Sequence, residues 1–380
     1  MSRDRPVAYD IIPYDPELKG QLADLQRHLW RGDAGANIAY LEWKYEQNPY
    51  WKTPLIYLAT SGRQVVAMRG MFGSAWEVGA ASETFLIPCA DDLVIAPEHR
   101  NRGLAALITR RAFEDLARGG YECVFSLSPG PVTLVTSLMG GWRQVGPMRP
   151  LERRASAGLL ERVHAGVSKV PVLWRHADAL RWLRHRHPPF SHLDRRDGPG
   201  RAPGNRAICL ERAPRSPAMA DLIRRLGHDG RVRHVRDERY LAWRFRNPLH
   251  EYRFLFSGDD GRLDGYLVLQ AYRLDRARGV NIVDWEGETR QVRAELLRAA
   301  IDWGGFDKLT IWTATLSEEV LALLSAAAFV PAVAGSRSRA PSVLVASTDP
   351  AAPAAEPALG GRRLLDVAEW DMRMLYSMAG

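Results

Sequence analysis

The spacing of hydrophobic residues along the chain predicts strands and helices in a mixed order. Apolar runs of period two indicate strands, and apolar positions three and four residues apart indicate helices. In the first half, the predicted strands are Tyr9–Pro13, Pro54–Ala59, Gln64–Met71, Asp92–Ala96 and Cys123–Leu127, and the predicted helices are a segment that ends near Trp30, Gly103–Arg118 and a segment that leads to Gly141-Trp142. In the second half, the predicted strands are Ala207–Glu211, Tyr252–Phe256, Gly265–Gln270, Gly279–Trp285 and Lys308–Thr313, and the predicted helices are Pro217–Gly227, Thr289–Trp303 and Ser317–Ala327. Each half has the order β-α-ββ-β-α-β-α, so we expect a mixed α/β fold.

The two halves also share a sequence repeat. Residues 40–49 and 240–248 both read Tyr-Leu-x-Trp, then Lys or Arg, an aromatic residue and, further on, Asn-Pro, with one residue fewer in the second copy. Chance recurrence of such a frame is improbable, so the repeat indicates a duplication. Because Trp43 and Trp243 recur together, we expect them to pack a helix against a sheet rather than to bind a ligand.

The repeat sets the predicted domain boundaries at residues 1–150 and 205–345. Between them, residues 151–204 predict a basic helical and loop linker, with Pro188-Pro189 in its loop part. Residues 346–380 begin with an Ala- and Pro-rich linker. The final segment carries Trp370 and Met372, and we expect it to pack back onto a domain.

Composition narrows the class of protein. Of the 380 residues, 46% are hydrophobic and 25% are charged, which is ordinary for a globular protein with two cores. We expect no membrane span, because no apolar run reaches about 18 residues. The charged N-terminus and three scattered cysteines predict a cytoplasmic protein without a secretory signal or a disulfide framework. The net charge of +8 is compatible with nucleic acid, an anionic membrane or an acidic small ligand.

The segment after Leu93 predicts a strand, a turn and a helix start that together suit an anion. A diphosphate needs several backbone N–H groups that point into one concavity, ideally at a helix N-terminus. Gly103 and Ala105 let the backbone approach such an anion, and Arg100 and Arg102 add positive charge. Residues 100–105 therefore predict a pyrophosphate-binding turn.

This turn resembles the motif of the GNAT superfamily of acyl-coenzyme A (acyl-CoA) N-acyltransferases. Arg100, Gly103 and Ala105 fill the three defined places of (Gln/Arg)-x-x-Gly-x-(Gly/Ala), and Gly141-Trp142 stands where that family commonly has Gly-Phe. The resemblance covers residues of roughly 8–150 by motif and about 205–335 by element order alone. The whole resembles tandem GNAT proteins with a degenerate C-terminal copy. It implies two domains, each with a central mixed, mostly antiparallel sheet flanked by helices.

The resemblance implies an enzyme that moves an acetyl or other short acyl group from acyl-CoA to a primary amine, directly and in a ternary complex. The acceptor would be a small-molecule or peptide amine, such as an amino sugar or a natural-product amine. A backbone N–H of the strand would polarise the thioester carbonyl. The implied contacts are the amides of Arg100, Asn101, Arg102, Gly103, Leu104 and Ala105 for the pyrophosphate, and the strand residues Val94, Ile95 and Ala96 for the pantetheine.

Acyl-CoA is the expected cosubstrate, and we expect no metal. The pair His185 and His187 lacks an acidic or cysteine partner nearby, so it is better explained as part of a basic, solvated face.

The sequence indicates the catalytic groups less clearly than it indicates the phosphate-binding turn. Many GNAT enzymes have, four residues before the Gly of Gly-Phe, a tyrosine that protonates the leaving thiolate. This chain has Ser137 there, which could donate only through a water or to a shifted substrate. The general base is often a carboxylate on the strand before the turn. Asp91 and Asp92 are the candidates, with Glu83 more remote, and alternation places only one of the two aspartates on the cleft face. These acids could instead solvate a hairpin or pair with an arginine.

The second copy lacks the turn. Gly287-Glu288-Thr289 follows Asp284-Trp285-Glu286, and carboxylates at this place would repel a phosphate. We therefore predict that the second domain binds no coenzyme A and shapes the acceptor site or buries a shared interface. Asp284 and Glu286 are expected to support the fold rather than to touch an acceptor.

Other functions remain open at this point. A non-catalytic CoA-binding pseudoenzyme or a ligand-sensing module is favoured by Ser137 and by the degenerate second copy. Nucleic-acid binding through the basic linker ranks last, because no recognition motif supports it. A covalent route through Cys89, the cysteine nearest the active strand, has weak support.

Overall fold

The structure is a computed structural model, and it describes residues 8–30, 32–127, 129–154, 189–195, 200–201, 207–259, 261–273, 279–332, 341–349 and 357–378. Most of the predicted basic linker, including His185 and His187, lies outside the described residues. The chain divides into two compact units, each built from separated stretches of sequence. Unit 1 comprises Met1–Met148, His228–Leu249 and Ser336–Met372, and unit 2 comprises Arg149–Gly227, His250–Gly335 and Arg373–Gly380. The linear domain ranges, which follow the sequence repeat, stay a prediction.

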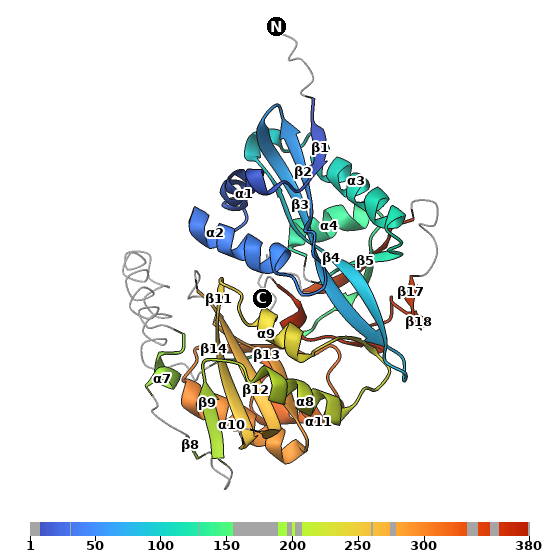
Figure 1. The fold of residues 1–380 in the computed structure, drawn as a ribbon. Coiled ribbons are helices and arrows are strands. Elements are labelled where there is room, and N and C mark those ends of the chain that lie inside the picture. Colours follow the sequence, from blue (N-terminus) through green and yellow to red (C-terminus); the bar gives the residue numbers. More distant parts are fainter. Residues whose placement is uncertain are drawn as a thin grey trace, which may run out of the picture. The chain divides into compact units, whose positions relative to one another are not determined.

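Unit 1 is built on a mixed sheet in which most neighbouring strands run antiparallel (Figure 1). The long hairpin of β3 and β4 is its centre, and it turns through two residues of positive φ, Gly79 and Ser82. The strand order is β1 (Asp10–Pro13), β2 (Leu55–Ser61), β3 (Gln64–Val78), β4 (Glu83–Ile95), β5 (Cys123–Ser126), β16 (Ser342–Ser347) and β6 (Arg143–Pro147), with β10 (Val232–His234) beside β3 and β19 (Trp370–Asp371) beside β10. A separate small ribbon pairs β17 (Ala358–Leu359) with β18 (Arg362–Arg363).

Helices cover both faces of this sheet, with α1 and α2 on one side and α3 on the other (Figure 1). The helix α3 follows from sequence, because its residues Leu104, Ile108, Ala112 and Leu116 recur every fourth position and are all buried. Asp33 caps α2 by accepting a hydrogen bond from the amide of Ala36. The helical segments of unit 1 are η1 (Pro16–Leu18), α1 (Lys19–Gln26), α2 (Ala34–Leu41), η2 (Glu42–Glu46), η3 (Pro97–His99), α3 (Leu104–Arg118), α4 (Pro131–Met139), α9 (Glu238–Arg244) and η5 (Val367–Glu369).

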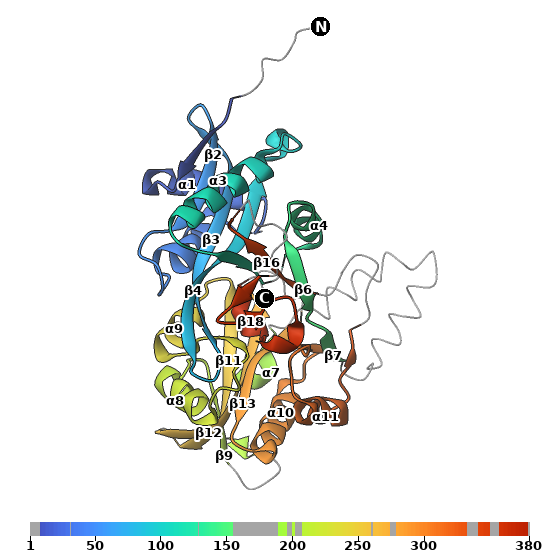
Figure 2. The ribbon, with the colours of Figure 1, turned by 90° about the vertical axis from the view of Figure 1, so that its right-hand side faces the viewer.

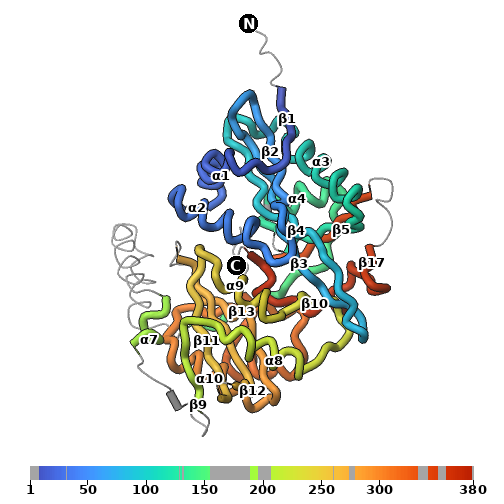
Figure 3. The backbone as a smooth tube through the Cα atoms, viewed as in Figure 1, coloured from blue at the N-terminus to red at the C-terminus, as the bar shows by residue number. Residues whose placement is uncertain are grey.

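Strands from distant parts of the chain complete the sheet of unit 1. The strand β16 lies between β5 and β6 and pairs antiparallel with both (Figure 2). The strand β10, which precedes the second copy of the repeat, pairs with the end of β3 at Trp76 and Glu77 (Figure 3). Unit 1 therefore contains the whole first copy of the repeat together with β10, α9 and β16 from the second half.

Unit 2 has its own sheet, completed by a strand from the first half. The strand β7 (Pro150–Arg154) pairs antiparallel with β14 and β15. The full order is β15 (Val330–Pro331), β7, β14 (Lys308–Trp312), β13 (Val280–Gly287), β12 (Arg262–Tyr272), β11 (His250–Asp259), β9 (Ala207–Glu211) and β8 (Gly200–Arg201). Its helical segments are α7 (Ser191–Asp194), α8 (Ser216–Leu226), α10 (Arg290–Gly304), α11 (Glu318–Ala326) and η6 (Met374–Tyr376).

The predicted fold class is confirmed, since both units have a central mixed sheet with flanking helices. The strand before the turn is much longer than the predicted Asp92–Ala96, because β4 begins at Glu83. None of the described helices is long and apolar enough to cross a membrane.

Candidate functional site

The strand β4 loses its neighbour on one side before it ends. It runs parallel to β5, but the two strands pair only at Cys89 and Phe125. The strand β5 ends at Ser126, whereas β4 continues to Ile95. Within the described residues, the stretch of β4 after Cys89 therefore has an open edge. Val94, Ile95 and Ala96 lie at its end, with the side chains of Val94 and Ala96 buried.

A β-bulge lies on this open stretch. Gly70 of β3 pairs with Asp91 and Arg69 pairs with Leu93, so Asp92 is an extra residue with no partner on β3. Its backbone has a φ of 44°, which is rare for a residue other than glycine. Bulges change the direction of neighbouring side chains, and this one brings two carboxylates to the same side of the strand.

The ammonium of Lys44 binds both aspartates. Its Nζ donates to Asp91 Oδ2 at 2.7 Å and to Asp92 Oδ2 at 3.0 Å. The expectation that alternation separates the two carboxylates was wrong, because the bulge interrupts the alternation between them. The side chain of Asp91 is 27% exposed, whereas those of Lys44 and Asp92 are fully buried. Asp91 is therefore the carboxylate that a substrate can reach.

Aromatic groups complete this cluster. Tyr45 donates its hydroxyl to Asp92 Oδ2 at 2.7 Å, and the Tyr40 hydroxyl accepts from Lys44 Nζ at 2.9 Å. Burial alone would lower the pKa of Lys44, but the charges of Asp91 and Asp92 outweigh it and raise that pKa above its usual value. Desolvation raises the pKa of Asp92, and the contact with Lys44 only partly opposes this. Lys44 is thus a fixed cation that keeps two carboxylates in place.

A π-helical turn presents Lys44 to the sheet. The amide of Gln47 donates to the carbonyl of Glu42 at 2.8 Å, five residues back, instead of the four of an α-helix. Three successive residues, Trp43, Lys44 and Tyr45, are buried. The equivalent helix α9 is an ordinary turn, in which the Phe245 amide donates to Leu241. The extra residue in the first copy of the repeat is therefore accommodated by the π-turn.

The two repeat tryptophans bind each other within unit 1. Their rings stack with centroids 5.0 Å apart. Trp43 Nε1 donates to the carbonyl of Trp243 at 2.8 Å, and Trp243 Nε1 donates to the carbonyl of Trp43 at 2.7 Å. These contacts support the expected structural role of the two tryptophans. The ring of each tryptophan packs against the tryptophan of the other copy of the repeat.

A cavity of about 980 Å³ lies beside this pair. It is lined by residues that follow the π-turn, including Tyr50 and Trp51, and by Arg239 and Arg246 of the α9 region. Sequence reasoning did not identify Lys44, Tyr45 or this cavity. The one available signal was the basic residue at a shared place in both copies of the repeat.

The turn from Arg100 to Ala105 joins the open strand to α3. Asn101 and Gly103 both have positive φ, at 59° and 75°, and Gly103 is the N-cap of α3. No side chain caps this helix. Within the described part of the chain, the amides from Asn101 to Ala106 donate to no protein group. Such successive free amides at a helix start form a concave anion site.

The charges around this turn are available to a ligand. Arg100, Asn101, Arg102 and Gly103 are exposed, and among the described residues the Arg100 guanidinium donates only to the Ile95 carbonyl, at 3.1 Å. The structure thus places all the predicted phosphate-binding residues on one turn. Their binding of a diphosphate stays a prediction.

Ser137 and Cys89 are the other groups for which the sequence suggested a chemical role. Ser137 is half-buried on α4, and its carbonyl accepts hydrogen bonds from the amides of Gly140 and Trp142 at 2.9 and 3.1 Å. Its role with the thiolate stays a prediction. Cys89 is fully buried, and burial raises the pKa of its thiol to about 12. A thiol that stays protonated at neutral pH is a poor nucleophile, which speaks against a covalent route.

The second copy fills the corresponding helix start with its own side chains. Thr289 caps α10 by accepting from the Val292 amide. Glu288 forms ion pairs with Arg225 and Arg262, and Glu286 with Arg293 and Arg373. Asp284 is bonded to Tyr266 and Arg373. These pairs agree with the predicted supporting role of Asp284 and Glu286.

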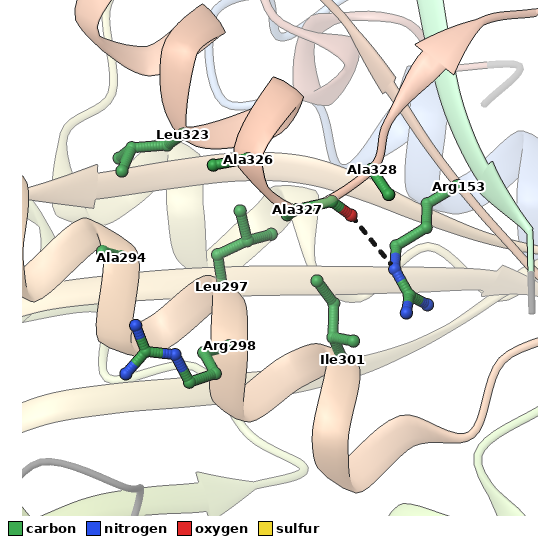
Figure 4. Close-up of a pocket in the computed structure, with 9 residues that line it drawn as sticks. All are labelled: Arg153, Ala294, Leu297, Arg298, Ile301, Leu323, Ala326, Ala327 and Ala328. Carbon is green, nitrogen blue, oxygen red and sulfur yellow. Dashed lines mark hydrogen bonds between the residues drawn. The ribbon is translucent and has the colours of Figure 1, made fainter.

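A smaller cavity in unit 2 lies between α10 and α11 (Figure 4). Its volume is about 360 Å³, and its lining is mostly alanine and larger aliphatic side chains. Arg153 borders it and donates to the carbonyl of Ala327 at 3.2 Å. The cavity offers no glycine turn for a phosphate. Among the described residues, no group of three or more His, Cys, Asp or Glu side chains is arranged to hold a metal.

Comparison with solved structures identifies the fold. No family model matches the chain, and no curated protein matches its sequence. A GCN5-related N-acetyltransferase from Anabaena variabilis is 13% identical, covers 90% of this chain and 73% of its own, and has a TM-score of 0.56. A probable N-acyltransferase from Enterococcus faecalis has the same identity and coverages with a TM-score of 0.54. A tandem GNAT protein from the clavulanic acid biosynthesis pathway is 13% identical, covers 90% of this chain and 99% of its own, and has a TM-score of 0.53. The chain therefore has the fold of the GCN5-related N-acetyltransferases, in a tandem arrangement.

Proposed function

We propose that the protein is an N-acyltransferase that uses an acyl-CoA thioester and a primary amine. The observation that carries this proposal is the row of free amides from Asn101 to Ala106, placed at the end of the open edge of β4. A diphosphate is the ligand that such a row suits, because each amide can donate to one of its oxygens and the α3 dipole favours its charge. The fold shared with GCN5-related N-acetyltransferases supports the same reading.

The donor would bind with its diphosphate on the turn and its pantetheine along Val94 and Ile95. An extended amide chain laid beside an open strand edge replaces the missing strand-to-strand hydrogen bonds. This would carry the thioester toward the bulge at Asp92. A free N–H of β4 at that place would polarise the thioester carbonyl.

Transfer would be direct. The amine nitrogen attacks the thioester carbonyl carbon, the C–N bond forms, and the C–S bond breaks as the thiolate leaves. We assign the general base to Asp91, which takes the proton of the attacking amine, because its carboxylate is partly exposed while that of Asp92 is fully buried. Lys44 and Asp92 would hold Asp91 in position. Ser137 is the candidate proton donor to the thiolate, through water.

The donor site is tested by changing the charge of the turn at constant size. No atom lies within 4 Å of where a side chain at Gly103 would begin, so Gly103→Gln and Gly103→Glu impose the same backbone strain. A carboxylate about 6 Å from a diphosphate of charge −2 costs about 1.4 to 2.8 kcal/mol at a dielectric constant between about 80 and 40. We expect Gly103→Glu to bind acetyl-CoA roughly 10 to 100 times more weakly than Gly103→Gln in calorimetric titrations. At about 1 M salt the difference should nearly vanish.

The matched control is Gly120→Glu. Gly120 also has positive φ and open space around it, but it follows the other end of α3, about 25 Å away. This variant should bind acetyl-CoA like the wild type. Equal affinity of the two Gly103 variants at low salt would refute the assignment of the turn.

Catalysis is tested by thiol release from acetyl-CoA with a panel of amines. We expect Asp91→Asn to lower the rate roughly 100-fold or more. The rival carboxylate Glu83 lies at the start of β4, about 26 Å from Asp91, and Glu83→Gln should leave the rate unchanged. Tight acetyl-CoA binding without turnover on any amine would instead indicate a non-catalytic binding module.

A further inference from the structure

A buried arginine next to the proposed donor site lacks any acceptor for its hydrogen bonds. Arg69 of β3 is only 4% exposed, and within the described structure it forms neither a hydrogen bond nor an ion pair. Its Nε is sealed from solvent without a partner. An arginine presents five N–H donors and keeps its charge in proteins, so burying it unpaired is costly. A bound group that accepts these hydrogen bonds would remove that cost.

The register of the sheet shows which face Arg69 occupies. Arg69 pairs with Tyr57 of β2, and directly opposed residues point to the same face. Tyr57 belongs to the core cluster that includes Leu104 and Ile108 of α3. Gly70, the next residue, faces Tyr45 and hence the side of Lys44. Arg69 therefore lies on the α3 side of the sheet, opposite to the buried ammonium.

The Arg69 side chain is long enough to span β4 to its open edge. Burial lowers the pKa of Arg69, and the charges that act on it are those of Asp91, Tyr45 and Asp92, all near the bulge. Asp115, which acts on Tyr57 on the opposite side, is not among them. Arg69 pairs with Leu93 of β4, and adjacent strands lie about 4.8 Å apart. An extended arginine side chain spans roughly 6 to 7 Å, so its head can reach the edge where β4 has no neighbour.

The two aspartates do not satisfy this arginine. Lys44 occupies one oxygen of each, the other Asp91 oxygen accepts from the Asp92 amide, and the other Asp92 oxygen, Oδ1, is buried without any partner. No carboxylate oxygen lies within 4.0 Å of the Arg69 guanidinium among the ion pairs of the described residues. Arg69 Nε therefore lacks an acceptor in the described structure, although two carboxylates lie near the bulge.

We propose that Arg69 recognises a carboxylate on the acyl group, so that the preferred donor is a short dicarboxylic acyl-CoA. This inference rests on the proposed function, because it places the acyl group at the open edge of β4. A planar guanidinium matches a carboxylate with two parallel hydrogen bonds, and charge-assisted pairs of this kind are the stronger class. A neutral acyl chain at the same place leaves the donors unsatisfied.

The test compares thioesters of equal carbon chain. Succinyl-CoA and butyryl-CoA differ by a carboxylate in place of a methyl group, and so do malonyl-CoA and propionyl-CoA. In calorimetric titrations of the full chain, at least one carboxylated thioester should bind roughly 10 to 100 times more tightly than its neutral partner. Lack of preference in both pairs, with free coenzyme A still bound, would overturn this inference and leave the proposed function intact. Failure to bind free coenzyme A would count against the proposed function itself.

Variants at position 69 separate recognition from packing. Arg69→Gln should abolish the preference while free coenzyme A binds as before, and Arg69→Lys should retain part of it. Arg110→Gln, which removes an exposed charge of α3, should keep the full preference. Without ligand, Arg69→Met should melt at a higher temperature than the wild type, because it removes an unpaired buried charge. If Arg69→Gln still preferred the carboxylated thioester, a residue other than Arg69 would recognise the carboxylate. If these variants do not fold, the comparison of carboxylated and neutral thioesters with the wild type alone tests the proposal.

Discussion

Replacing Lys44 by methionine tests the charge balance of the candidate site. The variant keeps a long, flexible side chain but removes the only ammonium that contacts Asp91 and Asp92 among the described residues. Asp91 is 27% exposed and can be solvated by water, whereas Asp92 is fully buried. The cost therefore falls on Asp92, which keeps the hydrogen bond from Tyr45 but must either stay charged without the ammonium or take up a proton.

Protonation sets an upper limit on that cost. At pH 7, a carboxyl group with an ordinary pKa of about 3.9 takes up a proton at a cost of about 4.2 kcal/mol, and at pH 5 the cost is about 1.5 kcal/mol. In the variant the pKa of Asp92 is higher in the folded than in the unfolded state, so the folded state binds more protons. Stability is then greatest at low pH and is lost as the pH rises. The destabilisation should approach about 4 kcal/mol at pH 7, close to the usual cost of breaking a buried pair.

The assay is urea unfolding of the wild type and Lys44→Met at pH 5, 6 and 7, with the difference in unfolding free energy as the readout. The control is the same lysine substitution in an Asp92→Asn background, where no buried carboxylate remains. There the cost of losing Lys44 should not change with pH. A cost in the single variant that is below about 1 kcal/mol, or that is the same at pH 5 and pH 7, would refute the charge balance described here.

Two further predictions concern the packing around this site. Burial lowers the pKa of His234 to about 3, so below pH 6.5 the unfolded chain binds the proton that the folded chain refuses. Stability that is present at neutral pH should be lost as the pH falls. Relative to His234→Gln, the wild type should lose about 2 kcal/mol between pH 6.5 and 5 in urea unfolding, and parallel pH profiles would contradict this. A methyl group at Gly70 would lie 2.0 Å from the Tyr45 hydroxyl, so Gly70→Ala should cost about 1 to 3 kcal/mol. Gly20→Ala on α1, with nothing within 4 Å, should instead stabilise slightly, and equal effects of the two would contradict the packing described.

Features that depend on a few consecutive residues could be predicted from sequence. The turn is one, since Gly103 and its neighbours encode both the positive φ and the helix start. The element order is another, because apolar periodicity is local. The bulge at Asp92 could not be predicted, because it depends on pairing with β3 and not on the sequence of β4. Alternation alone therefore gave the wrong geometry for the two aspartates.

The exchange of strands between the halves was also beyond sequence reasoning. The strands β7 and β16 are short and ordinary, and their own residues favour no particular neighbour. Their place depends on which sheet has an unfilled position, between β14 and β15 for β7 and between β5 and β6 for β16. A prediction of the contacts that Lys44 makes with Asp91 and Asp92 would require the same kind of long-range information. Yet the one-residue difference between the two repeat copies did carry a local signal, because the π-turn accommodates the extra residue of the first copy.

The tryptophan pair explains physically why the motif recurs in both halves although the phosphate turn does not. Each indole N–H donates to the main-chain carbonyl of the other tryptophan, and the two rings stack, so replacing either one leaves a buried carbonyl without its donor and removes the stacking. The turn has no such partner, and a second copy can lose it without harming unit 1. Because Trp43 precedes Lys44 directly, the same pair fixes the π-turn that holds the two aspartates. The helix α9 also brings Arg239 to the cavity of about 980 Å³. A copy that carries no phosphate turn thereby remains a structural part of the candidate site of unit 1.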